Sequence, residues 1–147
     1  MNADGSGRTK ALPDAIIEFE ALSADGKWAA VAQAVAGDPS VSIVAMPLVG
    51  GSPVNICRGY CYPFWNASGT LFSILPGYAA ERTVQIPVSP GKNIPELPPD
   101  GVPPDGNVAA IRGAKALEAV VIAGPGPDLS ATLHQTVHRN LYRVPLR

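Results

Sequence analysis

The residues with the most reactive side chains in this sequence are its two cysteines, Cys57 and Cys61. Structural zinc sites need four ligands, and no histidine lies near the pair in sequence, so the pair alone makes no zinc site. The spacing is C-x-x-x-C, which also differs from the C-x-x-C spacing of thiol redox enzymes. The pair could close a small-loop disulfide in an oxidising compartment, or it could remain as two reduced or half-buried thiols. The lack of a nearby histidine argues against a catalytic thiol.

The two histidines, His134 and His138, have the i, i+4 spacing of metal ligands on a helix. Position 135 is a glutamine, so the general base of the H-E-x-x-H motif is missing. We expect these histidines at a strand end and in the turn after it, with exposed side chains. No serine sits in a G-x-S-x-G nucleophile elbow either. The sequence therefore predicts that the chain is not an enzyme and holds neither a cofactor nor a metal ion.

The aspartates of the sequence are explained by turns. Several of them sit in expected turns next to glycine, proline or both, where a short side chain accepts backbone N–H bonds. They are Asp4, Asp25, Asp100, Asp105 and Asp128. No two of them are placed as a general acid and base.

The densest aromatic group is Tyr60, Tyr62, Phe64 and Trp65. Packing of a strand into a core is one explanation for such a group. The other is an exposed aromatic patch that contacts a partner protein. Tyr60, Tyr62 and Trp65 are therefore the candidate binding residues.

The composition excludes several classes of protein. The 147 residues are about one domain's worth, and 46% of them are apolar, enough for a core. A net charge of -1 gives no overall field that would attract nucleic acid or an anionic membrane. The longest unbroken apolar runs, Trp28 to Ala32 and Ala119 to Ala123, are far shorter than a membrane span. We therefore expect no nucleic-acid binding and no membrane contact by this segment.

An internal repeat is the strongest structural signal. The segment Ala24-Asp25-Gly26-Lys27-Trp28 matches Ala67-Ser68-Gly69-Thr70-Leu71, because each is a polar turn that ends in glycine before a large apolar residue. An apolar-Pro-apolar motif also recurs, centred on Pro47, Pro87 and Pro145. The two turns are separated by about 40 residues, and so are Pro47 and Pro87. A repeat of this length is typical of a four-stranded β-propeller blade.

These repeats predict an all-β chain, a partial β-propeller of about three blades of antiparallel four-stranded sheets. In the first full unit we expect strands at Ile16 to Leu22, Trp28 to Val35, Val41 to Met46 and Val54 to Cys57. In the second we expect Tyr62 to Trp65, Leu71 to Leu75, Arg82 to Val88 and Asn93 to Leu97. The turn residues are Asp25, Gly26, Gly50, Gly51, Ser68 and Gly69. A helical alternative exists for Asp14 to Gly37 and Gly113 to Gly124, which are rich in helix-favouring residues, but Asp25-Gly26 interrupts the first.

A proline-rich stretch separates the second unit from the third. Leu97-Pro98-Pro99-Asp100-Gly101 is followed at once by Val102-Pro103-Pro104-Asp105-Gly106. Such a sequence favours polyproline and turn conformations over a strand. We expect it to be a surface loop between blades.

Residues Leu22 to Trp28, followed by Pro47 to Pro53, resemble the TolB-type, WD-like propeller repeat. In that repeat a Ser-Pro-Asp-Gly-Lys turn precedes an aromatic strand, and a later strand ends before a Gly-Gly turn; here Ala24 replaces the proline. The segment Thr136 to Leu146 looks like the terminal blade of propellers attached to bacterial serine/threonine protein kinases. The kinase motifs themselves are missing from the sequence.

A closed propeller needs at least four blades, and the chain holds two complete blades and parts of two more, so we expect it to be the C-terminal piece of a larger propeller. We assign residues 1–13 to the end of a preceding blade, 14–58 and 59–97 to blades, 98–106 to the loop and 107–147 to a last, incomplete blade. The two ends of the chain would supply complementary parts of one blade, because Arg8 to Leu12 would be its fourth strand and Asn140 to Leu146 its third strand. Two copies could exchange these strands, which predicts self-association; an open arc completed by the remainder of a larger propeller is the alternative.

The sequence and the resemblance together predict a non-catalytic protein-interaction or sensor domain of a larger bacterial kinase-type signalling protein. One alternative is a propeller that accompanies a prolyl-oligopeptidase-type hydrolase, and another is a propeller that binds a small ligand or a carbohydrate. The expected partner is a protein, or the rest of the propeller. The segment would be extracytoplasmic in a membrane-anchored parent and cytoplasmic otherwise.

Overall fold

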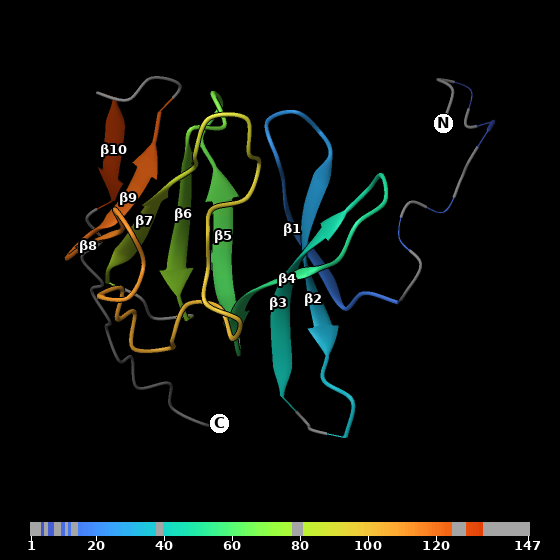
Figure 1. The fold of residues 1–147 in the computed structure, drawn as a ribbon, viewed down its shortest axis with the longest axis horizontal. Helices are drawn as coiled ribbons and strands as arrows, with labels where there is room; N and C mark the ends of the chain where they lie inside the picture. The colour runs from blue at the N-terminus through green and yellow to red at the C-terminus, as the bar shows by residue number, and fades with distance from the viewer. Residues whose placement is uncertain are drawn as a thin grey trace, which may run out of the picture.

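The structure, a computed structural model, describes residues 4, 6–7, 10, 12, 15–37, 40–77, 81–124 and 129–133 (Figure 1). These residues form antiparallel sheets of four, four and two strands and no helix. The prediction of an all-β chain is therefore confirmed for them. The helical alternative is wrong for the described parts of 14–37 and for 113–124.

The first sheet is a meander in which consecutive strands pair. Its strands are β1 (Glu18–Leu22), β2 (Trp28–Ala34), β3 (Val41–Pro47) and β4 (Val54–Arg58). Val31 and Ala32 point to opposite faces of β2, yet both are fully buried. Both faces of this part of the sheet are thus covered, which explains why β2 and β3 are nearly continuous apolar runs.

The second sheet repeats the meander but takes its fourth strand from further along the chain. Its strands are β5 (Cys61–Trp65), β6 (Leu71–Pro76), β7 (Thr83–Pro87) and β8 (Lys115–Leu117). The expectation of a fourth strand at 93–97 is wrong. Pro95 has no N–H to give to a ladder, and Asn93 instead accepts a bond from the Trp65 indole Nε1 at 2.7 Å.

The third sheet is a pair, β9 (Val120–Ala123) with β10 (Ser130–Leu133). Buried Thr83 on β7 joins it to the second sheet: its Oγ1 donates to the Ala119 carbonyl and accepts from the Val121 N–H, each at 2.8 Å. The three sheets therefore stand in series (Figure 1). His134, His138 and the strand expected at 140–146 lie outside the described residues.

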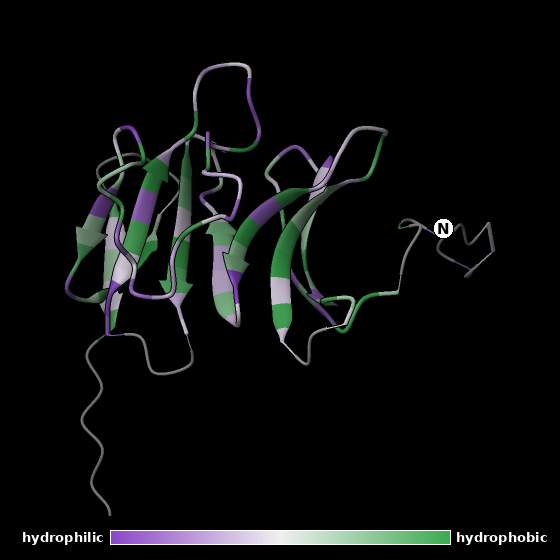
Figure 2. Ribbon diagram, turned by 60° about the horizontal axis from the view of Figure 1, so that its bottom comes forward, coloured by the Kyte–Doolittle hydropathy of each residue, from purple (hydrophilic) through white to green (hydrophobic). Residues whose placement is uncertain are grey.

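The main core lies between the first two sheets. One face of each contributes fully buried apolar side chains, among them Ile43 and Ile56 from the first sheet and Phe72 and Ile74 from the second. Hydrophobic residues are accordingly concentrated in the strands (Figure 2). The Trp65 ring meets the Phe72 ring edge to face, with 4.8 Å between centroids. A second cluster on the other face of the first sheet consists of Ala29, Val31, Val44 and Met46, with Leu12 and Leu48 against it.

The repeated turns have the same hydrogen bonds in both sheets. In the β1–β2 turn the Trp28 N–H donates to Ser23 Oγ at 3.0 Å, and in the β5–β6 turn the Leu71 N–H donates to Asn66 Oδ1 at 3.0 Å. Gly26 and Gly69 have φ of +71° and +69°. The two units thus share one turn design as well as one strand order.

Replacing Gly26 or Gly69 by valine should lower the free energy of unfolding by roughly 1 to 3 kcal/mol, because a β-branched residue is strained at positive φ. The Cβ of residue 26 would meet no atom within 4 Å, and that of residue 69 would touch only Ala24 Cβ at 3.4 Å. Backbone strain is therefore the main cost at both sites. Urea unfolding of the two variants measures it, and unchanged midpoints would contradict this account of the turns.

Candidate functional site

The proline-rich stretch is a loop that lies along β4. The Val102 N–H donates to the Ile56 carbonyl at 2.7 Å, and Asn55 Nδ2 donates to the Pro99 carbonyl at 2.8 Å. Val102 is only 1% exposed and forms a parallel bridge with Cys57. The stretch therefore covers the edge of β4 that β3 leaves open, which protects it from pairing with another chain.

The two consecutive five-residue segments of this stretch form the same kind of turn. The Gly101 N–H donates to the Pro98 carbonyl at 2.8 Å, and the Gly106 N–H donates to the Pro103 carbonyl at 2.9 Å. Both glycines have positive φ, +75° and +69°. Two consecutive tight turns thus place Val102 between them, against β4.

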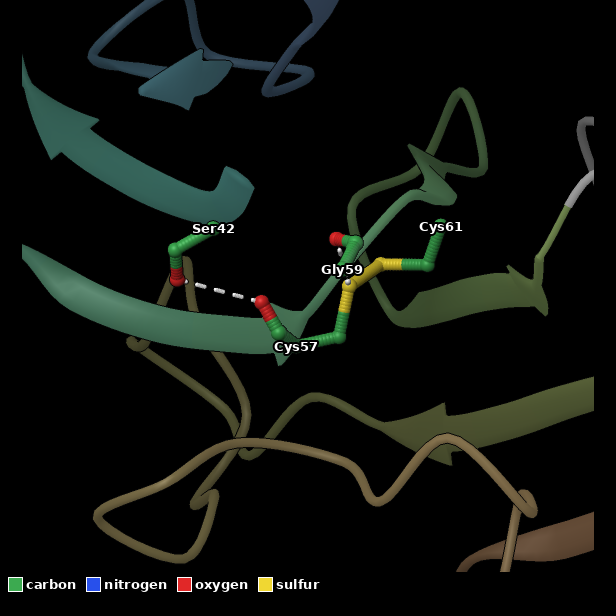
Figure 3. Close-up of a disulfide and its surroundings, with 4 residues drawn as sticks. All are labelled: Ser42, Cys57, Gly59 and Cys61. Carbon is green, nitrogen blue, oxygen red and sulfur yellow. Dashed lines mark hydrogen bonds between the residues drawn. A yellow bond between two sulfur atoms is a disulfide. The ribbon is translucent and has the colours of Figure 1, made fainter. Parts of the chain in front are cut away.

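Cys57 and Cys61 form a disulfide, which settles the choice that the sequence left open (Figure 3). The bond links the end of β4 to the start of β5 and so ties the first sheet to the second. Both cysteines are buried, and the Cys57 carbonyl accepts a bond from Ser42 Oγ at 3.2 Å. The disulfide fixes the place where one repeat unit passes to the next.

Replacing both cysteines by serine should lower the free energy of unfolding by about 2 kcal/mol, the loop-closure entropy of a ring this small. The matched measurement is urea unfolding of the wild-type protein with and without a dithiol reductant. The reduced protein and the double variant should unfold at similar urea concentrations. Equal stability of the oxidised and reduced protein would show that the disulfide does not stabilise this fold.

A cleft of about 600 Å³ opens beside the disulfide, between the two four-stranded sheets and the proline-rich stretch. Its lining is mostly apolar and includes both half-cystines. The other lining residues are Ser40, Arg58, Gly59, Tyr60, Ile74, Pro76, Gly77, Val102, Pro103 and Pro104.

The three aromatic candidates do not lie together in this cleft. Tyr60 lines it. Trp65 has its indole bonded to Asn93 and its ring against Phe72, which explains it as a packing residue. Half-buried Tyr62 pairs with Leu75 across β5 and β6, on the face of the sheet away from the main core.

Arg58 is the one cationic side chain among the lining residues of the cleft. The ion pairs among the described residues are Lys27–Asp25 at 3.6 Å and Arg82–Glu118 at 3.7 Å, and Arg58 belongs to neither. Arg58 also borders a smaller hollow of about 260 Å³ that includes Asp100. Sequence reasoning missed Arg58, although the position of the run Arg58-Gly59-Tyr60 between two cysteines is a signal that could have found it.

The carboxylates with displaced pKa values lie away from the cleft. A bond from the Ser23 hydroxyl and one from the Lys27 N–H lower the pKa of Asp25 in its turn. Partial burial, with Glu18 nearby, raises the pKa of Glu20 on β1.

No three His, Cys, Asp or Glu residues in the described part of the chain are grouped as metal ligands. Over the same residues, no helix is long and apolar enough to cross a bilayer.

Comparison with family models, curated proteins and solved structures finds no match for this chain.

Proposed function

We propose that this chain is a non-catalytic interaction or sensor domain, built as part of a TolB-type β-propeller in a larger bacterial kinase-type signalling protein. The observation that carries the proposal is the repetition of one unit. Two four-stranded meanders with the same strand order and the same turn hydrogen bonds follow each other and face each other across one core.

The placement of the first strands supports the proposal. β1 contacts β5, so the first strands of the two units are neighbours. In a propeller the blades repeat radially, and their first strands gather around the centre. The third sheet, beside the second, would then be the start of another blade.

Exposed apolar side chains at the two ends of the series also support a larger assembly. Phe19 on β1 is 55% exposed, and Ile122 on β9 and Leu133 on β10 are similarly exposed. Apolar surface of this kind is typical of sites that another protein surface covers. The remainder of a propeller, a protein partner or a second copy would each cover it.

Selection from a library of short random peptides tests the interaction function. The folded chain should enrich peptides with a shared consensus that bind with one-to-one stoichiometry and micromolar Kd. The same peptides should not bind the chain in urea. Failure to enrich any consensus, with the fold verified by circular dichroism, would contradict the proposal.

A further inference from the structure

We propose that the cleft beside the disulfide binds a small molecule with a flat apolar body and a single anionic group, such as an aromatic carboxylate. The proposal rests on the interaction or sensor function and names a ligand class for it. The cleft volume of about 600 Å³ lies within the range of small-molecule pockets.

The walls of the cleft suit a flat apolar body. Ile74 and Val102 supply aliphatic surface, and Pro76, Pro103 and Pro104 supply rigid rings with fixed φ. The disulfide lies between the two sheets, and the Val102–Ile56 bond holds the third wall in place. Walls held in this way lose little freedom when a ligand enters, which favours affinity.

The charge of the cleft selects an anion. Arg58 lines it, and a guanidinium presents a planar fork of donors that matches a carboxylate or sulfonate. Asp100 borders the smaller hollow together with Arg58 and would repel a second anionic group. One anion beside an apolar body is therefore the chemistry that fits.

Two fluorescent probes with the same aromatic body separate the apolar and charged contributions. Anilinonaphthalene sulfonate carries one anionic group, and phenylnaphthylamine carries none. The anionic probe should bind the oxidised full chain at one site and more tightly than the neutral one. Arg58→Gln should weaken the anionic probe roughly five- to tenfold, the effect of one partly exposed charged hydrogen bond, and leave the neutral probe within about twofold.

Two further variants complete the test. Arg112→Gln removes another exposed arginine that does not line the cleft, and it should leave both Kd values unchanged. Ser40→Phe places bulk at the lining and should weaken both probes. Thermal unfolding checks that each variant is folded.

Equal effects of Arg58→Gln and Arg112→Gln, or binding that Ser40→Phe leaves intact, would overturn the proposal, because the probe would then lie elsewhere. Equal weakening of both probes by Arg58→Gln would overturn the selection of an anion. If peptide selection succeeds while neither probe binds, the ligand proposal fails and the interaction function stands. If the probes bind as expected while no peptide is enriched, the protein-partner function fails and the ligand site stands.

Discussion

Replacing Gly101 by alanine should lower the free energy of unfolding by roughly 3 kcal/mol or more, since it combines backbone strain with a clash against a buried main chain. Gly101 has φ of +75°, and a Cβ built on it would lie 2.4 Å from the Ile56 carbonyl oxygen and 2.5 Å from its carbonyl carbon. Those atoms belong to β4 and cannot move as a flexible side chain could. The variant should lose the Val102–Ile56 bond and expose the edge of β4.

Gly91→Ala is the matched control. Its φ is +76°, almost the same, but a Cβ there would meet no atom within 4 Å. The control should therefore lose only the strain of the left-handed conformation, about 1 kcal/mol. Urea unfolding gives both free energies, and hydrogen exchange of the Val102 amide reports release of the stretch directly. If the two variants lost similar amounts of unfolding free energy, the close approach of residue 101 to Ile56 would not be the cause of the destabilisation.

The strands of the first sheet were predictable because everything that specifies them is local. Asp25-Gly26 and Gly50-Gly51 mark turns, and the segments between them are apolar and β-branched. Gly50 and Gly51 indeed have φ of +58° and +119°. The predicted strand bounds differ from the observed ones by at most two residues.

The fourth strand of the second sheet was not predictable in the same way. β8 is three residues long and pairs with β7 across an intervening segment of 27 residues, 88–114. Neither its length nor its composition distinguishes it from a turn, so only the free edge of β7 selects it. The burial of Val102 is a similar case, because a single apolar residue among prolines carries no periodic signal.

In the candidate site, too, residues close together in the chain could be predicted, and residues brought together by folding could not. The two cysteines and Tyr60 could be singled out from the sequence, because they lie within five consecutive residues. Their neighbours could not be singled out in this way, because Pro76 and Pro104 reach the cleft only through the packing of the second sheet and the proline-rich stretch. Spacing alone also left the disulfide open, since it depends on where β4 ends and β5 begins.

Replacing Phe72 by alanine should lower the free energy of unfolding by about 3 to 5 kcal/mol, the usual cost of emptying a fully buried phenylalanine site. Phe72 is 0% exposed in the core that the two large sheets share, and its ring contacts Trp65 edge to face. The cavity would lie between the two sheets, so neither could collapse into it alone. The variant should unfold at a much lower urea concentration, with a slope that shows whether one sheet melts before the other.

Phe19→Ala is the control, with the same atoms removed from a side chain on β1 that is 55% exposed. It should cost less than about 1 kcal/mol in the isolated chain, because most of the ring is already in water. If the proposed propeller is correct, the same substitution in the larger protein should cost clearly more, since a further blade or a partner would cover Phe19. A Phe72→Ala loss no larger than that of Phe19→Ala would contradict the shared core. Equal costs of Phe19→Ala in the isolated chain and in the larger protein would instead show that β1 faces solvent in both.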